Sequence, residues 1–441
     1  MYLTELHISG IKLIRDLKLT FTRESKPRMW TVLLGENGLS KTTILQCIAM
    51  VAMGTNKANQ IANVPSLVPL RRELQGGRGV LSLAGAVRGE FEVSSRAERP
   101  GLPSGVGPTR LYSEITRAAG WSDLKGSSNW HVDGQALGEP SPLTEIRARE
   151  IAHYFVAGYG VTRSIPFPNA AAQPRDRASD RVRSLFEPHW QIAATDFARR
   201  FPSVLGDADF VRQFERVLNI VLVESGLLPN IRGFRLSGEA HEDVFSQDLA
   251  PNEQMAVPAP WLSHGYQSTV AWVADLVGQA LLDRRPGSAE PADFEGLVLV
   301  DELDLHLHPS WQRRLVSTLK KVFPKLQFIA TTHSPIVLAG LEADEIIRLK
   351  RAPDGGVLAE TNTTNPAFLT PTELLNEFFG FGDEFPSEVG QQMHEYMVLA
   401  TNPFRDDQEE RQLDALRAEL TAKKATPSIQ PTPRKAATEQ S

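Results

Sequence analysis

A glycine-rich segment that ends in a lysine and two threonines carries the clearest chemistry in the sequence. It spans residues 35–43 and has the sequence GENGLSKTT. Glycines let the backbone curl so that several N–H groups point at one anion. Lys41 would bring a positive charge to the β- and γ-phosphates of a nucleotide, and the Thr42 hydroxyl suits Mg²⁺. We therefore predict a loop for ATP and Mg²⁺ made of Gly35, Glu36, Asn37, Gly38, Leu39, Ser40, Lys41, Thr42 and Thr43.

Ser40 departs from the usual pattern of such loops, which have glycine immediately before the lysine. Because serine has a Cβ atom, a left-handed backbone at this position would cost about 1 kcal/mol or more. The alternative interpretation is a chance glycine-rich turn before a helix. We interpret Ser40 as a tolerated variant, because two further motifs downstream fit the same chemistry.

Two acidic residues follow a buried apolar run further along the chain. The run covers residues 296–300 and ends in Asp301 and Glu302. The carboxyl ends of parallel strands are where α/β sheets bind ligands. We predict that Asp301 shares Mg²⁺ with Thr42, and that Glu302 is the base that orients the attacking water. The alternative is a strand that ends in solvated acids.

A histidine follows a second apolar run. Residues 328–332 end directly before His333, Ser334 and Pro335. A neutral imidazole at a strand end can donate a hydrogen bond to the γ-phosphate and so report its presence. A purely structural histidine is the alternative. With this residue, the predicted catalytic side chains are Lys41, Glu302 and His333.

A serine and a glycine precede a long predicted helix in the segment WLSHGYQS, residues 261–268. The N–H groups at the start of a helix form an anion site. The nucleotide bound by the first loop does not need a second such site on the same chain. We therefore predict that this segment closes over the nucleotide of a second copy; a simple helix cap at Ser263 is the alternative. The predicted trans-acting residues are Ser263, His264, Gly265 and Gln267.

Hydrophobic patterning predicts the elements that position these motifs. Alternation over residues 2–21 predicts two antiparallel strands, and the apolar run at 29–34 predicts a buried strand that ends at the loop. Helical spacing over 183–226 predicts a helical lobe. Further elements are predicted as a helix at 44–49, strands at 154–157, 297–300, 327–331 and 345–350, short strands or loop at 232–236 and 242–245, and helices at 266–283 and 310–322.

Composition narrows the class of protein. The chain has 441 residues, 41% hydrophobic and 23% charged, with a net charge of −6, which is typical of a soluble globular protein without a global nucleic-acid footprint. One cysteine, Cys47, allows no intrachain disulfide, so we expect a cytoplasmic protein. No apolar run is long enough to cross a membrane. A local DNA contact is a hypothesis for Arg175, Arg177, Arg181 and Arg183; a solvated loop is the alternative.

The order of the motifs resembles that of the ABC-type ATPases: a Walker A loop, an LSxGxQ-like signature, a Walker B Asp-Glu pair and a switch histidine. The segment LHP at 307–309 and the sequence HSP at 333–335 are similar to the branch that includes SMC, RecF and OLD ATPases. Within that branch the chain resembles in particular the AAA_21-type proteins, and the Septu, retron-associated and abortive-infection ATPases are similar. His264 replaces the second signature glycine. No glutamine can be assigned to the Q-loop, for which residues 159–163 are the better landmark, and Tyr2 is a candidate for stacking on adenine.

The resemblance implies an α/β P-loop NTPase fold: an ABC-type head with a mixed central sheet, an antiparallel β lobe and a helical lobe. It implies a homodimer that sandwiches ATP and Mg²⁺, hydrolyses ATP and regulates an effector protein, a nuclease or toxin, in anti-phage defence. A DNA-repair or chromosome-associated ATPase, RecF-like or SMC-like, is the alternative. We predict a single head over residues 1–420, with an N-terminal lobe at 1–165, a helical lobe at 183–285, a C-terminal lobe at 296–400, and a disordered tail at 421–441.

Overall fold

The computed structural model divides the chain into two compact units, Met1–Leu374 and Leu375–Ser441. It describes residues 1–63, 71–72, 80–81, 84–94, 96–102, 109–118, 121–137, 141–149, 151, 153–163, 165, 177–190, 192, 208–236, 243–250, 253–283, 290–379, 388–425, 427 and 429–433. Within these ranges no helix combines the length and the apolar composition that a membrane crossing requires.

A mixed six-stranded sheet forms the centre of the first unit. In spatial order its strands are β12 (Val156–Tyr159), β16 (Gly296–Val300), β17 (Leu326–Thr331), β5 (Trp30–Leu34), β18 (Ile346–Arg351) and β19 (Val357–Thr361). Neighbouring strands are parallel except β18 and β19, which are antiparallel. Every residue of the first four strands is buried, as expected where helices cover both faces of a parallel sheet. The apolar runs of the sequence therefore predicted these strands to within two residues.

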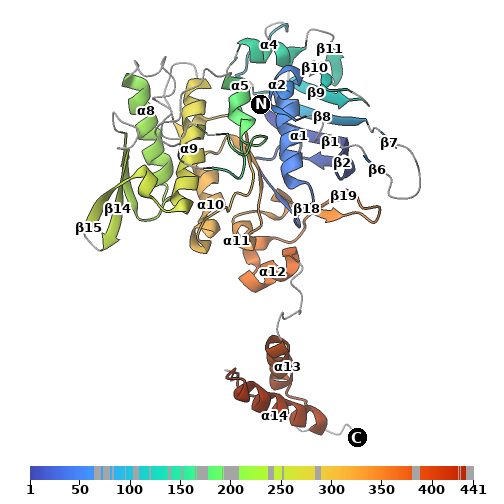
Figure 1. The fold of residues 1–441 in the computed structure, drawn as a ribbon, viewed down its shortest axis with the longest axis vertical. Helices are drawn as coiled ribbons and strands as arrows, with labels where there is room; N and C mark the ends of the chain where they lie inside the picture. The colour runs from blue at the N-terminus through green and yellow to red at the C-terminus, as the bar shows by residue number, and fades with distance from the viewer. Residues whose placement is uncertain are drawn as a thin grey trace. The chain divides into compact units, whose positions relative to one another are not determined.

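A second, antiparallel sheet confirms the predicted β lobe. In spatial order its strands are β11 (Gln135–Leu137), β10 (Lys125–Val132), β9 (Thr109–Arg117), β8 (Gly85–Glu92), β1 (Tyr2–Ile11) and β2 (Ile14–Thr20). Helix α1 (Lys41–Met53), blue in Figure 1, contacts strands of both sheets. It is buried almost all round, so it forms the core between the two sheets. The smaller elements of this region are β3 (Thr22–Arg23), β4 (Lys26–Pro27), α2 (Thr55–Ile61), β6 (Arg71–Arg72), β7 (Val80–Leu81) and α4 (Pro142–Arg149).

In the described part of the helical lobe, two neighbouring helices pack beside a small sheet. Helix α8 (Ala208–Leu218) continues as the π-helix η2 (Asn219–Glu224) and contacts the long helix α9 (His264–Asp283), beside which it lies in Figure 1. The sheet is β13 (Ile231–Arg235), β14 (Val244–Ala250) and β15 (Glu253–Pro258). Strand β15 was not predicted from the sequence, because its first four residues are exposed at a sheet edge and show no alternation. The remaining elements of the first unit are α5 (Arg177–Arg183), η3 (Ala259–Trp261), η4 (Pro291–Asp293), α10 (Pro309–Val322), α11 (Pro335–Leu338), η5 (Ala343–Glu345), η6 (Pro366–Phe368) and the start of α12 (Pro371–Phe379).

The second unit corrects the predicted C-terminal boundary. Helices α13 (Glu388–Thr401) and α14 (Asp407–Ala422) enclose an apolar core of their own, so the predicted head over 1–420 differs from the observed division at 374–375. The prediction of disorder from 421 does not hold at Ile429, which packs on this core and accepts a hydrogen bond from the Tyr396 hydroxyl at 3.1 Å. The final residues, 434–441, lie outside the described ranges.

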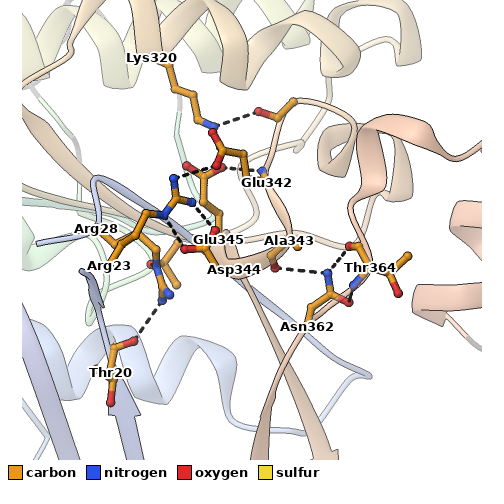
Figure 2. A network of polar contacts seen from close by, with 12 residues as sticks. Thr20, Arg23, Arg28, Lys320, Glu342, Ala343, Asp344, Glu345, Asn362 and Thr364 are labelled. Carbon is orange, nitrogen blue, oxygen red and sulfur yellow. Dashed lines mark hydrogen bonds and ion pairs between the residues drawn. The ribbon is translucent and has the colours of Figure 1, made fainter. Parts of the chain in front are cut away.

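A polar network fixes the turn that leads into β18, and Figure 2 shows it from close by. Arg23 binds Glu342 at 2.7 Å and Asp344 at 2.6 Å. Lys320 of α10 donates to Glu345 at 2.5 Å. Contacts from β3 and from α10 therefore hold η5 in place, and with it strand β18, which pairs with β5.

One buried side chain links the two large sheets. Gln327, on β17, donates to the carbonyl oxygens of Leu3 at 2.9 Å and Arg28 at 3.0 Å, and it accepts the Leu3 N–H at 2.7 Å. Gln327 is fully buried, so these groups have no access to water as an alternative partner. The apolar pattern predicted that residue 327 lies in a strand, but the pattern did not indicate that its side chain bonds to Leu3 and Arg28.

Gln327→Leu should lower the free energy of unfolding by about 2–5 kcal/mol, because it leaves buried backbone groups without partners. Urea denaturation measures the loss. The control is Lys350→Ala, which removes a half-exposed ion pair with Glu360 and should cost about 1 kcal/mol or less. Equal losses in the two variants would show that Gln327 does not link the sheets.

Candidate functional site

The glycine-rich loop joins the carboxyl end of β5 to the start of α1. Gly38 has φ +82°, and a Cβ atom at Gly35 would lie 2.9 Å from the Leu349 carbonyl oxygen, so both glycines are required by the backbone path. Ser40 has φ 61° and ψ 25°, the left-handed conformation expected for the glycine that it replaces. Its side chain makes no cap hydrogen bond to the helix that follows. The loop therefore retains the predicted shape and carries strain at its last residue.

Lys41 lies folded over this loop. Its Nζ donates to the carbonyl oxygens of Gly35 at 2.6 Å and Glu36 at 3.0 Å, and the residue is 7% exposed. Burial lowers the pKa of Lys41, and nearby carboxylates oppose this effect. The amine therefore lies within the loop, at the carboxyl edge of the sheet, where phosphates are predicted to bind.

Asp301, which follows β16, is bonded to the end of β17 and to the start of α1. One carboxylate oxygen accepts the Thr42 hydroxyl at 2.7 Å, and the other accepts the Thr331 hydroxyl at 2.6 Å. Asp301 is 3% exposed, whereas a strand that merely ended in solvated acids would leave this carboxylate in water. Hydroxyl and carboxylate oxygens are hard donors of the kind that Mg²⁺ prefers, so Thr42 and Asp301 fit the predicted metal.

The backbone of Glu302 is held from two directions. Its N–H donates to Thr331 Oγ1 at 2.7 Å, and its carbonyl oxygen accepts from Arg163 Nη2 at 2.6 Å. Its φ is 47°, which is uncommon for a residue with a side chain. The carboxylate thus projects from a fixed, strained turn at the edge of the sheet.

Asp304 connects this turn to His333. Its Oδ1 accepts the Thr332 hydroxyl at 2.5 Å and the His333 N–H at 3.3 Å. The His333 residue is exposed, next to the acidic turn. The sequence analysis missed Asp304, Thr331 and the contact of Arg163, because nothing in residue spacing indicates which hydroxyl or guanidinium reaches an acid from another strand.

The signature segment lies at the start of α9. Ser263 and His264 are exposed. Gly265 is required by packing, since a Cβ atom would lie 2.4 Å from the His306 carbonyl oxygen. The Gln267 amide donates to the carbonyl oxygens of Pro260 and Leu262, so it holds its own chain. Among the described residues, no hydrogen bond or ion pair joins residues 263–267 to the phosphate loop, and a role in trans stays a prediction.

The structure corrects the candidate basic patch. Residues 177–183 form helix α5 instead of a polar loop. Arg181 is buried and pairs with Asp283 at 2.8 Å, and Arg183 pairs with Glu187 at 2.8 Å while its guanidinium lies over Trp190. Arg175 and the side chain of Arg177 lie outside the described residues.

Tyr2 cannot serve as an adenine platform. Its hydroxyl donates to the Lys325 carbonyl oxygen at 3.1 Å. Lys325 precedes β17, so this contact lies at the amino edge of the parallel sheet, opposite the phosphate loop.

Comparison with known proteins agrees with this geometry. The AAA_21 family model, described as "AAA domain, putative AbiEii toxin, Type IV TA system", matches residues 30–339. The Septu protein PtuA of Bacillus mycoides (strain KBAB4) is 25% identical over 425 residues, which cover 95% of this chain and 50% of that protein. The Retron Ec83 probable ATPase of Escherichia coli is 43% identical over 148 residues, 30% of this chain and 27% of that protein. The chain thus spans half or less of the length of these relatives.

A solved structure is also similar. An SMC head, crystallised with the C-winged helix domain of ScpA, aligns with a TM-score of 0.50 and 16% identity over 83% of this chain and 99% of that one. At this level of identity, the likeness concerns the fold. It confirms the predicted α/β head with a mixed sheet.

Ser40→Gly should raise the free energy of unfolding by about 1 kcal/mol, because glycine adopts the left-handed conformation without the Cβ clash. Ser40→Ala is the matched control: it removes the hydroxyl, keeps the Cβ atom and should be close to neutral. Urea denaturation of the two variants separates these effects. A gain in the alanine variant as large as that in the glycine variant would place the cost in the hydroxyl instead of the backbone.

Proposed function

The chain belongs to the AAA_21 family of ATPases, and from this we propose that it binds ATP with Mg²⁺, hydrolyses ATP and works as a dimer of heads. The observation that carries the proposal is one continuous set of hydrogen bonds. Thr42 donates to Asp301, and Thr331 donates to Asp301 while accepting the N–H of Glu302. The phosphate loop and the residue expected to act on water are thus parts of one rigid unit.

The proposed reaction is in-line attack of water on the γ-phosphate. Glu302 takes a proton from the water while the new P–O bond forms, and the bond to the ADP oxygen breaks. Lys41 exchanges its loop carbonyls for phosphate oxygens and offsets their charge. Thr42 and Asp301 would hold Mg²⁺, which neutralises phosphate charge when bound. His333, placed by Asp304, would bind the γ-phosphate.

We place the second half of each site on a partner copy. Ser263 and His264 are exposed at the start of a 20-residue helix, whose N–H groups suit a phosphate. The proposed homodimer brings these residues to the γ-phosphate that the other copy holds. Within its own chain, the helix start packs at Gly265 against the turn that follows Glu302.

The proposed output is control of an effector protein, a nuclease or toxin, in anti-phage defence in the cytoplasm. It is supported by the likeness to a Septu protein and to a retron probable ATPase. The alternative is an ATPase that acts on DNA, and the likeness to an SMC head, at 16% identity, concerns the fold and not this role. The pairing of Arg181 and Arg183 within the protein weakens that alternative, since both side chains already have acidic partners. A pull-down from the native host, with and without nuclease treatment, distinguishes an effector from DNA.

Glu302→Gln should bind ATP but hydrolyse it at least a hundredfold more slowly, because the metal ligands remain and the base does not. The uncleaved γ-phosphate should also trap a dimer. Turnover is measured by phosphate release, and dimers by gel filtration with ATP. Lys41→Ala, which should lose about 1.5–3 kcal/mol of binding, is the control that stays monomeric. A Glu302→Gln protein that binds ATP without turnover and remains monomeric would rule out the head-to-head dimer.

Sharing in trans is tested by mixing two inactive variants. Ser263→Arg places bulk and charge where the partner's γ-phosphate must fit, so ATP binding should stay near normal while hydrolysis falls. A heterodimer with Lys41→Ala then contains one intact composite site. Activity of the mixture above that of either variant alone is the expected result. A mixture that stays inactive, although heterodimers are present, would contradict independent trans-acting sites.

A further inference from the structure

Arg163 lies beside the acids of the site but has no role in the function proposed above. It belongs to the segment that leaves β12, the strand next to β16. Gly160 fixes the path of this segment: its N–H donates to Ser184 Oγ at 3.2 Å, and a Cβ atom would lie 2.1 Å from the Ser184 carbonyl oxygen. The chain therefore passes close against Ser184 before it carries Arg163 to Glu302.

Only one of the three guanidinium nitrogens of Arg163 makes a hydrogen bond in the described structure. Nη2 donates to the Glu302 carbonyl oxygen at 2.6 Å, and the residue is 6% exposed. Nε and Nη1 are also buried, and neither has a hydrogen-bond partner in the described structure. Burying charged donors without partners is costly, and such donors are suited to bind an anion.

Arg163 and Lys41 share one electrostatic environment. Burial lowers the pKa of both residues, that of Arg163 to about 10, and the carboxylates of Asp301, Glu302 and Asp304 oppose the effect in both cases. Arg163 therefore remains a cation at neutral pH. Arg163 is 6% exposed and Lys41 is 7% exposed. Arg163 is therefore as buried as the lysine that we expect to bind the phosphates.

We propose that Arg163 is a second cationic ligand of the terminal phosphate of ATP. Nε and Nη1 bind γ-phosphate oxygens while Nη2 holds the carbonyl of Glu302. The planar fork of a guanidinium can make these contacts together, which a lysine cannot. The inference rests on the proposed function, because it requires ATP in the loop at 35–43. It gives the site a means to distinguish ATP from ADP, which lacks the phosphate that Arg163 binds.

The test compares two nucleotides on the full chain. Arg163→Ala should weaken binding of the β,γ-imido analogue of ATP about ten- to a hundredfold, whereas the affinity for ADP should change less than about twofold. Calorimetry with Mg²⁺ present measures both. Arg28→Ala is the matched control, since Arg28, which precedes β5, is equally buried but donates to the Thr31 hydroxyl and to the Thr20 carbonyl oxygen. It should leave the ratio of the two affinities unchanged.

Arg163→Lys provides a second variant if the alanine protein does not fold. It keeps the charge and loses the fork, so the analogue should bind with an intermediate affinity and ADP normally. An unchanged ratio of the two affinities, in whichever variant folds, overturns the inference. If the wild-type protein binds neither nucleotide, the proposed function itself fails. If the wild type binds both nucleotides and the Arg163 variants bind them with the same ratio of affinities, the proposed function stands and only the proposed role of Arg163 is rejected.

Discussion

The site depends on one buried carboxylate, whose partners come from a neighbouring strand and from helix α1. Asp301 is removed from water, and its two oxygens are satisfied by the hydroxyls of Thr42 and Thr331. An unpaired charge in this position would be strongly unfavourable. The end of β17 and the start of α1 must therefore both lie beside this carboxylate. Parallel pairing meets the requirement, since it places the carboxyl ends of β5, β16 and β17 at one edge of the sheet.

Two residues with an uncommon positive φ lie at this same edge. Ser40 directly precedes α1, and Glu302 follows β16 by two residues. Strained residues persist only where the surrounding structure determines their conformation. At Glu302 the determining contacts are the hydrogen bonds from Arg163 and to Thr331. At Ser40 the contact is in the first turn of α1, where its carbonyl oxygen accepts the Ile44 N–H at 2.9 Å. Both strained residues are therefore held by hydrogen bonds to their backbone groups, next to Lys41 and to the Glu302 carboxylate.

The sequence was sufficient for features that depend on local pattern. Apolar runs located the central strands, and the left-handed conformation at Ser40 followed from its place in the loop motif. Features set by distant contacts were not predictable. Arg181 belongs to a charged segment that reads like solvated loop, but its burial is decided by Asp283, about a hundred residues away along the chain. Strand β15 was not predicted, because it is an exposed edge strand. The helix pair of α13 and α14 was not predicted as a separate unit, because we expected one continuous head to include these residues, although the pair has a core of its own.

The balance of charge at the sheet edge explains why a cationic side chain is needed there in addition to Lys41. Three carboxylates, those of Asp301, Glu302 and Asp304, act on the same region as the loop that is expected to receive phosphates. Bringing a polyphosphate toward them is unfavourable unless cations lie between the acids and the nucleotide. Lys41 supplies one such charge on the side of the loop, and Mg²⁺ held by Thr42 and Asp301 would supply another when bound. Arg163 supplies a third from the side of β12, and its contact with the Glu302 carbonyl couples that charge to the backbone from which the acid projects. The acids can then stay close to the reacting phosphate, as their chemistry requires, without repelling it.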